Sequence, residues 1–352
     1  MRVKSMSLSL SIPIQHGTHA QVFVCLPCYN EAENLSQLLQ QIHSTLTNLL
    51  HSDALEKQSF GIEKYQILAV DDGSTDHTAE ILNNFAGSYP LTVVSHRHNQ
   101  GLAETYRTLI ETLKTRAEND DIAVFMDADN THPPQIIADL VKVASTEADV
   151  VVASRYKDGS EIGVPLRRRI LSKVVNWLVR NLCGIAVRDC TSGFRAYRVQ
   201  ILKELPPLES KGFEVSAEVL IRIAMHKPPC KIKEIPLTLH YDRKKGSSKI
   251  HISQTMKAYV KLVWKHSKID LTPSIRRVTY KISQRLGKTY DKDHVFWNDG
   301  IIALAFLIVS FFIYDSLTRT LPQSLRLLGY VGIAFISFCI QHFLRRFWVF
   351  QE

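Results

Sequence analysis

The sequence lacks the motifs that mark several common kinds of nucleotide-binding and metal-binding protein. No G-x-G-x-x-G follows its first apolar run, which argues against a dinucleotide-dependent oxidoreductase. The stretch DGS (72–74) lacks the Gly-Lys-Ser/Thr ending of a P-loop. The histidines and cysteines also lack the spacing of a zinc site. We therefore expect neither of these phosphate-binding loops and no zinc centre.

A recognisable export signal is missing as well. The first residues, MRVKSMSLSLSIPIQHG, contain neither a long apolar core nor a clear cleavage site. We therefore expect no signal peptide, and reduced thiols at the six cysteines. The pair CLPC (25–28) has the spacing of a redox or zinc half-site, but Cys28 leads directly into YNEAENL, which has an explanation of its own.

Acidic residues are fewer than basic ones, and the formal net charge of the 352 residues is +9. The basic residues concentrate at 167–173, at 243–249 and along 257–292. Such an excess suits a polyanionic partner, which could be nucleic acid, a phosphate-bearing ligand or an anionic membrane. The length allows one large or two ordinary domains with a proper core.

Apolar runs that read as buried strands alternate with segments of helical periodicity. We expect strands at 21–27, 65–70, 91–96, 121–129, 148–156 and 231–241, and helices at 31–46, 78–86, 102–116, 134–146, 167–184 and 214–226. The first strand is expected to stop at Pro27, and residues 47–63 and 187–198 read as polar connections. Because the strands are almost continuously apolar, the sequence predicts an α/β fold with a parallel, doubly wound sheet.

Acidic stretches follow three of the expected strands. They are YNE (29–31), DDGSTD (71–76) and DAD (127–129). In open α/β sheets, ligands bind beyond the carboxyl ends of the strands. We therefore expect the three stretches to border one ligand site.

Asp127 and Asp129 are the strongest candidates for metal binding. They lie one residue apart with no lysine beside them in the sequence, and Pro133 and Pro134 prevent the strand from continuing. A turn after the strand can direct both carboxylates to one point. Two such carboxylates suit Mg²⁺ or Mn²⁺, which also takes phosphate oxygens and neutralises a departing diphosphate. The alternative is an ordinary solvated acidic turn.

The C-terminal part of the chain is different in character. Residues 300–314 carry no charge, and residues 327–343 carry none unless His342 is protonated. With their flanks, both runs reach the roughly 20 residues that a membrane-spanning helix needs. We predict two transmembrane helices, with a buried helical hairpin as the alternative. The excess of Lys and Arg on the near side predicts that the large domain is cytoplasmic.

Six motifs occur in a characteristic order: CLPCYNEAENL, VDDGSTDHT, MDADNTHPP, ASRY, DCTSGF and RKKGSSK. In this order they resemble a family 2 glycosyltransferase of the GT-A fold, in the branch of dolichol-phosphate mannose synthases and bacterial polyprenyl-phosphate glycosyltransferases. The resemblance covers about residues 20–250. It implies an N-terminal arm (1–19), a GT-A domain (20–250), a basic juxtamembrane helical segment (251–294) and a two-helix transmembrane hairpin (295–350).

The resemblance also implies roles for individual residues on the donor side. The residues implied in binding the nucleotide-sugar donor are Pro27, Tyr29, Glu31, Asp71, Asp72, Asp127, Arg243 and Lys249. Within this set, Asp72, with Asp71, matches the acid that reads the base. Asp127 and Asp129 match the motif that binds Mg²⁺ or Mn²⁺ and the diphosphate. Two departures from the family are Thr131, which stands where a Gln often helps to bind metal, and the long 47–63 connection.

On the acceptor side, the resemblance implies that Arg155, Arg169 and Ser172 hold the phosphate of a polyprenyl phosphate. Asp127, Asp129 and Arg155 are the implied catalytic residues. A phosphate oxygen is largely ionised near neutral pH, so positioning and electrostatic stabilisation are enough and no strong base is needed. The basic amphipathic helix expected at 167–182 suits a membrane surface, although ordinary packing with a solvated basic face is an alternative.

The interpretation is therefore an inverting, metal-dependent transfer of one sugar to polyprenyl phosphate at the cytoplasmic membrane face. The partners are the donor, the acceptor and the bilayer, and not nucleic acid; a homo-oligomer stays open. One rival is transfer to another lipid, such as a diacylglycerol or a glycolipid, whose hydroxyl would require a base such as Glu214 or Glu218. A second rival is an inactive membrane scaffold that binds nucleotide sugar.

Overall fold

The computed structural model describes residues 20–51, 61–246 and 252–267 of the chain. Most of these belong to one compact unit, and of the described residues, 170–177 and 267 belong to a second. The expected arm (1–19), Lys249, most of the 251–294 segment and the expected membrane hairpin (295–350) lie outside the described residues. Among the described residues, no helix has the length and apolarity needed to cross a bilayer.

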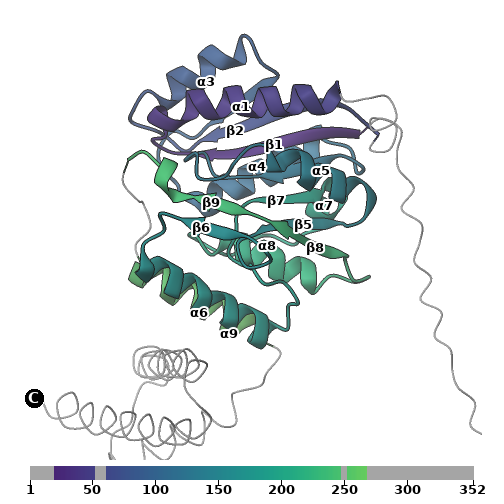
Figure 1. Cartoon of the computed structure of the whole chain (residues 1–352), viewed down its shortest axis with the longest axis vertical. Helices are drawn as coiled ribbons and strands as arrows, with labels where there is room; N and C mark the ends of the chain where they lie inside the picture. The colour runs from purple at the N-terminus through teal and green to yellow at the C-terminus, as the bar shows by residue number, and fades with distance from the viewer. Residues whose placement is uncertain (1–19, 52–60, 247–251, 268–352) are drawn as a thin grey trace, which may run out of the picture. The chain divides into compact units, whose positions relative to one another are not determined.

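The first unit is built on a seven-stranded sheet in the order β3-β2-β1-β4-β7-β5-β8 (Figure 1). Its strands are β1 (Ala20–Cys28), β2 (Ile62–Asp71), β3 (Leu91–Ser95), β4 (Ile122–Phe125), β5 (Val150–Ser154), β7 (Arg195–Arg198) and β8 (Ile232–Pro236). All neighbours are parallel except β7, which is antiparallel to both β4 and β5. A second, two-stranded parallel sheet joins β6 (Ser160–Ile162) to β9 (Thr238–His240). The fold is α/β with a mixed, mostly parallel sheet.

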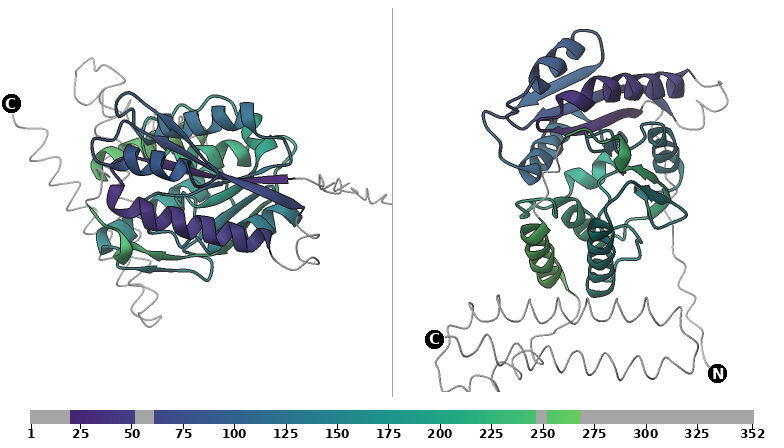
Figure 2. Two further views of the ribbon diagram at one scale, coloured as in Figure 1. Left: turned by 90° about the horizontal axis from the view of Figure 1, so that it is seen from above. Right: turned by 60° about the vertical axis from the view of Figure 1, so that its left-hand side comes forward.

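Helices cover both faces of the large sheet (Figure 2). The helices of the described residues are α1 (Ala32–Leu50), α3 (Thr78–Ala86), α4 (Leu102–Arg116), α5 (Ile136–Thr146), α6 (Leu166–Cys183), α7 (Val199–Lys203), α8 (Val215–Ala224) and α9 (Ile252–His266), with the 3₁₀ turn η1 (Tyr241–Arg243). Helices α1 and α5 pack on the face that carries Val22, Val24 and Leu26 of β1. Helix α4 lies on the other face, where Tyr106 contacts Phe125 of β4 with ring centroids 5.1 Å apart.

Burial follows the predicted periodicity closely. In α1, the residues at helical spacing are at most 1% exposed; these are Leu35, Leu38, Leu39, Ile42 and Leu46. In β1, residues 22–26 are at most 2% exposed on both faces, as expected of a central parallel strand. These apolar patterns account for the position of α1 over the sheet and fix the register of β1 between β2 and β4.

Several predicted boundaries are wrong. Strand β1 continues through Pro27 to Cys28, where it still pairs with β2. Proline is tolerated at position 27 because β4 pairs with β1 only as far as Cys25, so the N–H that proline lacks is not needed on that side. Strand β4 ends at Phe125 rather than 129. Two residues later, the N–H of Asp127 donates to His132 Nδ1 (3.2 Å) instead of to a neighbouring strand. Asn130 then has a positive φ of 62°, which turns the chain away from the sheet.

Other predictions are wrong because polar residues occur in segments that form strands. The expected loop 187–198 contains β7 at the centre of the sheet, and the single strand expected at 231–241 is divided into β8 and β9. Arg195 in β7 is fully buried, and its guanidinium donates to the carbonyls of Ser216 (2.5 Å) and Cys190 (2.8 Å). Backbone acceptors thus compensate a charge that would otherwise make this strand improbable in a core.

Candidate active site

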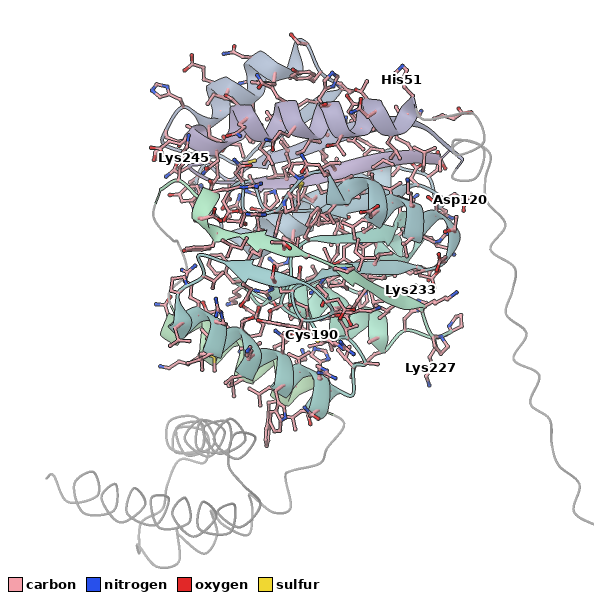
Figure 3. The ribbon with its side chains drawn as sticks, viewed as in Figure 1. His51, Asp120, Cys190, Lys227, Lys233 and Lys245 are labelled. Atoms are coloured by element: carbon pink, nitrogen blue, oxygen red, sulfur yellow. The ribbon has the colours of Figure 1, made fainter. Side chains whose placement is uncertain are left out.

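Three neighbouring parallel strands bring the acidic stretches to the same edge of the sheet. Strand β1 lies between β2 and β4, so the residues that follow these strands begin side by side. Figure 3 shows Lys245 near this edge and Asp120, which precedes β4, on the opposite side of the domain. The three acidic stretches therefore begin at the same edge of the sheet, and the ligand site that they were expected to border stays a prediction.

The loops after β1 and β2 are joined by hydrogen bonds. Asn30, at φ 50°, donates its N–H to Ser74 Oγ (3.0 Å), and its Oδ1 accepts from the N–H of Thr75 (2.8 Å). The N–H of Glu31 donates to Thr78 Oγ1 (2.8 Å). These bonds fix Glu31 and the start of α1 against the loop that carries Asp71 and Asp72.

Asp72 is buried and both of its carboxylate oxygens accept hydrogen bonds from the chain. Oδ1 accepts from the N–H of Gln100 (2.9 Å) and lies 2.7 Å from His96 Nδ1, and Oδ2 accepts from the N–H of Gly101 (2.8 Å). His96 Nε2 in turn lies 2.9 Å from Thr108 Oγ1 on α4. Asp72 therefore orders the connection between β3 and α4. Asp71 is also buried, and its Oδ1 accepts from the N–H of Ser74 (3.2 Å).

Gly73 allows the loop after β2 to lie close to the connection between β3 and α4. Gly73→Ala is expected to destabilise the domain by about 1–3 kcal/mol or more. Gly73 has φ +66°, and a Cβ there would lie 2.4 Å from the carbonyl carbon of His98. Urea unfolding of the variant measures the loss. Gly87→Ala is the matched control, because its nearest neighbour would be 3.7 Å away at ordinary φ; equal stability of the two variants would contradict the argument.

Asp127 and Asp129 follow β4 and differ in their surroundings. The side chain of Asp127 is 44% exposed, and that of Asp129 is 14% exposed. Asp129 Oδ1 accepts from the hydroxyl (2.7 Å) and the N–H (3.2 Å) of Thr131, while Oδ2 accepts from Lys244 Nζ (2.5 Å). No lysine stands beside the pair in the sequence, but the fold brings Lys244 to Asp129 from more than 100 residues away.

The imidazole of His132 contacts both the backbone and the side chain of Asp127. Its Nδ1 accepts the N–H of Asp127, so in the neutral ring the proton is on Nε2, which lies 4.0 Å from Asp127 Oδ2. The imidazole is buried and stacks on Phe194, with centroids 5.0 Å apart. These contacts fix the orientation of the turn that carries both aspartates.

The two carboxyl groups also differ electrostatically. Desolvation raises the pKa of Asp127, and the negative charge of Asp129 adds to that rise. Desolvation would also raise the pKa of Asp129, but the nearby ammonium of Lys244 outweighs it and lowers that pKa below its ordinary value. Asp129 is thus held as a carboxylate, opposite a cation.

The donor set fits a hard divalent cation. Mg²⁺ and Mn²⁺ prefer carboxylate oxygens, and Mg²⁺ is commonly held by one or two carboxylates together with substrate phosphates. Across the described ranges, no three His, Cys, Asp or Glu residues are grouped so as to hold an ion among themselves. Asp127 and Asp129 would supply the carboxylate ligands, and the hydroxyl of Thr131 orients Asp129.

A basic segment, residues 241–246, lies against this edge. The side chain of Asn34 on α1 binds the backbone of Lys245: Oδ1 accepts from its N–H (3.2 Å), and Nδ2 donates to its carbonyl (3.3 Å). Arg168 on α6 donates to Tyr241 Oη (2.9 Å). Arg243 is exposed on η1. Asn34 lies in the motif CLPCYNEAENL and Lys244 in RKKGSSK, but neither residue was predicted to have a role.

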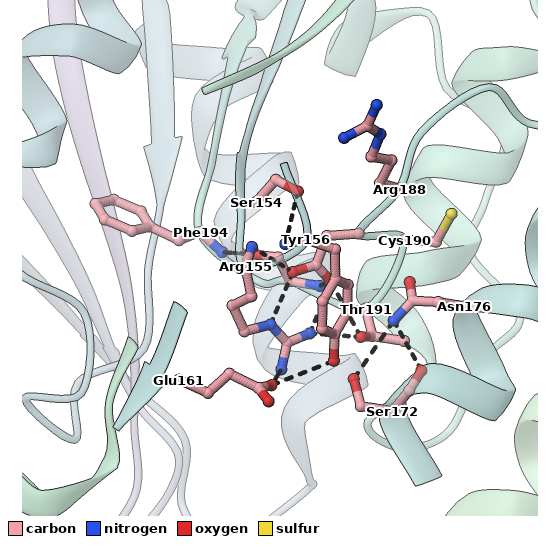
Figure 4. A network of polar contacts seen from close by, with 12 residues as sticks. Ser154, Arg155, Tyr156, Glu161, Ser172, Asn176, Arg188, Cys190, Thr191 and Phe194 are labelled. Carbon is pink, nitrogen blue, oxygen red and sulfur yellow. Dashed lines mark hydrogen bonds and ion pairs between the residues drawn. The ribbon is translucent and has the colours of Figure 1, made fainter. Parts of the chain in front are cut away.

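Arg155 lies in a dense polar network (Figure 4). Its guanidinium forms two 2.7 Å bonds to the fully buried carboxylate of Asp189 and a third to Thr191 Oγ1. A longer bond of 3.4 Å reaches Glu161 Oε1. This bidentate pair connects the end of β5 to the DCTSGF motif. The geometry favours a structural role for Arg155, beside its predicted role at an acceptor phosphate.

Of the other predicted acceptor residues, Arg169 meets Glu161 and Ser172 is on the same helix. Arg169 Nε lies 3.2 Å from Glu161 Oε2, and 40% of its side chain is exposed. Glu161 thus connects Arg155 and Arg169, a role that the sequence did not reveal. Ser172 belongs to the second compact unit, where its carbonyl accepts from Asn176 Nδ2 (2.8 Å).

Glu214 and Glu218, the candidate bases, both accept hydrogen bonds from the backbone. Glu218 is fully buried, and its carboxylate accepts from the N–H groups of Glu209 and Ser210 and from Arg222 Nε (2.7 Å). Glu214 Oε1 accepts from the N–H groups of Lys211 (3.0 Å) and Gly212 (3.3 Å). Both carboxylates stabilise the connection before α8.

Both thiols of the CLPC pair are buried, and the Cys28 thiol donates to the carbonyl of Leu26 (3.6 Å). Burial raises the pKa of the Cys25 thiol far above its ordinary value, which opposes formation of a reactive thiolate. The redox or zinc alternative for this pair therefore finds no support.

Comparison with known proteins adds independent information. The sequence model described as Glycosyl transferase family 2 matches residues 23–206. The chain is 30% identical over 247 residues to "Polyprenol monophosphomannose synthase" of Mycolicibacterium smegmatis, covering 69% of this chain and 85% of that protein. It is 30% identical over 250 residues to "Dolichol-phosphate mannosyltransferase" of Pyrococcus furiosus, covering 70% of this chain and 63% of that protein.

A third relative is "Undecaprenyl-phosphate mannosyltransferase" of Micrococcus luteus, 29% identical over 235 residues, or 65% of this chain and 87% of that protein. Among solved structures, glucosyl-3-phosphoglycerate synthase from Mycobacterium tuberculosis in complex with Mn²⁺, uridine-diphosphate and phosphoglyceric acid superposes with a TM-score of 0.50. It is 19% identical and covers 69% of this chain and 76% of that one. This likeness shows a GT-A-type fold.

Proposed function

Because the chain belongs to glycosyltransferase family 2, we propose that it transfers one sugar, mannose in the first place, from a nucleotide sugar to polyprenyl phosphate. The observation that carries the proposal is the meeting of Asp127 and Asp129 with a basic segment at the ligand-binding edge of the sheet. The names of the three mannose-transferring relatives support the choice of sugar and acceptor.

On the donor side, the predicted residues remain proposals. We assign the nucleotide to the loops of Pro27, Tyr29, Glu31, Asp71 and Asp72, and the diphosphate to Asp127, Asp129, Arg243 and Lys249 with a divalent cation. Mg²⁺ or Mn²⁺ held by the two aspartates would neutralise negative charge on the diphosphate. The hydrogen bonds between the β1 and β2 loops pre-organise the nucleotide side, and Thr131 and His132 hold the aspartates in place.

On the acceptor side, an ionised phosphate oxygen would form the new bond to the anomeric carbon while the bond to the nucleoside diphosphate breaks. Direct displacement would invert the configuration at that carbon. Arg169 is more accessible to an acceptor phosphate than Arg155, because 40% of its side chain is exposed against 12%, and Arg155 and Ser172 are the other proposed contacts. We propose that the reaction occurs at the cytoplasmic face of a membrane that the C-terminal runs span.

Transfer to a lipid hydroxyl is the rival, and Glu214→Gln tests it. Gln can still accept the N–H groups of Lys211 and Gly212, so the fold should persist. We expect the rate with polyprenyl phosphate to stay within about threefold of wild type, whereas loss of a true general base costs about 10²–10⁴-fold. Initial rates with defined acceptors decide, and Glu218→Gln serves as a second variant. A loss of the larger size in either variant, with intact folding, would favour the rival.

A donor screen tests the proposed function itself. Membranes that contain the full chain are incubated with GDP-mannose, UDP-glucose or UDP-linked amino sugars, short-chain polyprenyl phosphate and Mg²⁺ or Mn²⁺. Mass spectrometry of the lipid fraction identifies the product. We expect a hexose-phosphate polyprenol from GDP-mannose. If no nucleotide sugar yields any lipid product, the inactive-scaffold alternative is supported instead.

A further inference from the structure

Lys244 occupies the oxygen of Asp129 that faces the basic segment. The Nζ–Oδ2 distance is 2.5 Å, and the two side chains are only 13% and 14% exposed. A buried ammonium requires a partner, and here the partner is one of the two carboxylates proposed to hold a divalent cation. The other oxygen of Asp129 already accepts two hydrogen bonds from Thr131.

Asn34 holds Lys244 in this position through the next residue. Its side-chain amide forms hydrogen bonds with both the N–H and the carbonyl of Lys245, in the manner of a strand partner. Asn34 is 3% exposed, and its Nδ2 also donates to Glu31 Oε2 (2.8 Å). Helix α1 thereby fixes the backbone immediately after Lys244.

An ammonium at hydrogen-bond distance and a divalent cation cannot share the same carboxylate oxygen without strong repulsion at such a short distance. We propose that Lys244 is a tethered competitor for the divalent cation at Asp129, held in place by Asn34, so that cation binding requires Lys244 to leave. This inference rests on the proposed function, because it takes Asp129 as a ligand of the catalytic cation.

The competition has a consequence for the order of events. Without donor, Lys244 neutralises Asp129 and weakens binding of the cation alone. A nucleoside diphosphate supplies negative charge to which the displaced ammonium can move. Cation and donor therefore bind with positive coupling, and each strengthens binding of the other by the same factor. Lys244 acts here as a positioning residue that links residues 241–246 to the state of the cation site.

The test measures Mn²⁺ affinity of the detergent-solubilised full chain without donor, from the electron paramagnetic resonance signal of free Mn²⁺. Lys244→Met should bind Mn²⁺ about tenfold more tightly than wild type, because no ammonium has to be displaced. Asn34→Ala should bind about threefold more tightly, because the lysine is less firmly held. Lys245→Met is the matched control. It removes an equal charge one residue away and leaves the backbone bonds to Asn34, so its affinity should stay within about twofold of wild type.

Thermal melting confirms that the variants are folded. The inference is overturned if Lys244→Met binds Mn²⁺ no more tightly than Lys245→Met, a result that leaves the proposed function intact. If neither wild type nor any variant binds Mn²⁺ with or without nucleoside diphosphate, the metal part of the proposed function fails together with the inference. Tighter binding by Lys244→Met, with loss of coupling to the nucleotide, supports it.

Discussion

Replacing Asp129 with alanine is expected to slow sugar transfer by about 10²–10³-fold, the size typical of losing one preorganised electrostatic group. Asp129 is held as a carboxylate by Thr131 and Lys244 at the edge of the sheet. Without it, the cation and the diphosphate lose one of their two proposed protein carboxylates, and Lys244 loses its partner. Asp127→Ala should cost at least as much, because Asp127 is the more exposed of the two carboxylates.

The measurement is the initial rate of lipid-linked product formation at saturating donor and Mn²⁺. Asp120→Ala is the control: this exposed residue precedes β4 at the opposite end of the strand (Figure 3), and its rate should be unchanged. Thermal melting checks that the variants are folded. A rate for Asp129→Ala close to that of Asp120→Ala would remove the metal-diphosphate role from this residue.

Replacing Asp189 with alanine is expected to lower the free energy of unfolding by about 3–5 kcal/mol, because it removes the bidentate charge partner of the buried Arg155 guanidinium and leaves it the longer ion pair with Glu161 (3.4 Å). Asp189 is fully buried, and the Arg155 side chain is 12% exposed. The Asp189 carboxylate also accepts the N–H groups of Arg155 (3.0 Å) and Ser192 (3.0 Å), so the substitution also leaves backbone donors unsatisfied.

Urea unfolding of the full chain, followed by tryptophan fluorescence, measures this loss. Glu111→Ala is the matched control. Glu111 forms an i,i+3 pair with Lys114 and its side chain is 68% exposed, so the change should be within about 0.5 kcal/mol. A loss for Asp189→Ala of the size seen for Glu111→Ala would mean that the network in Figure 4 contributes little to stability.

The stability loss caused by Asp189→Ala is expected to depend on pH with a definite sign. Burial alone would raise the pKa of Asp189, but the charge and hydrogen bonds of Arg155 outweigh it and lower that pKa below its ordinary value. A depressed folded-state pKa stabilises the fold above the unfolded-state pKa, and this contribution is lost as pH falls through the folded-state pKa. The deficit of Asp189→Ala should therefore be constant near neutral pH and shrink below about pH 4.

The apolar pattern predicted most of the architecture. Continuous apolar runs placed β1, β2, β3 and β5, and helical spacing placed α3 and α4 at their observed bounds. This succeeded because burial on two faces leaves a strong pattern in a sequence. Strand β7 was not predicted, for the opposite reason. Its buried arginines are compensated by carbonyls of residues distant in the sequence, which no local pattern can indicate.

The candidate site was predictable in its location and less so in its contacts. The acidic motifs after three strands were enough to place Glu31, Asp72 and Asp127 at one edge. The partners of these residues depend on tertiary structure. The hydrogen bonds of Asp72 to Gln100 and Gly101, and the ion pair of Asp129 with Lys244, join segments that are far apart in the chain. A motif identifies a carboxylate, but the fold decides what that carboxylate faces.

The central claim is transfer to an ionised phosphate without a general base, and a comparison of two acceptors of equal chain length tests it most directly. The full chain, with the donor selected by the screen and Mn²⁺, is given either polyprenyl phosphate or the corresponding polyprenol, and product is quantified by mass. We predict glycosylated product from the phosphate and none above background from the alcohol. Comparable rates with the two acceptors would contradict the account.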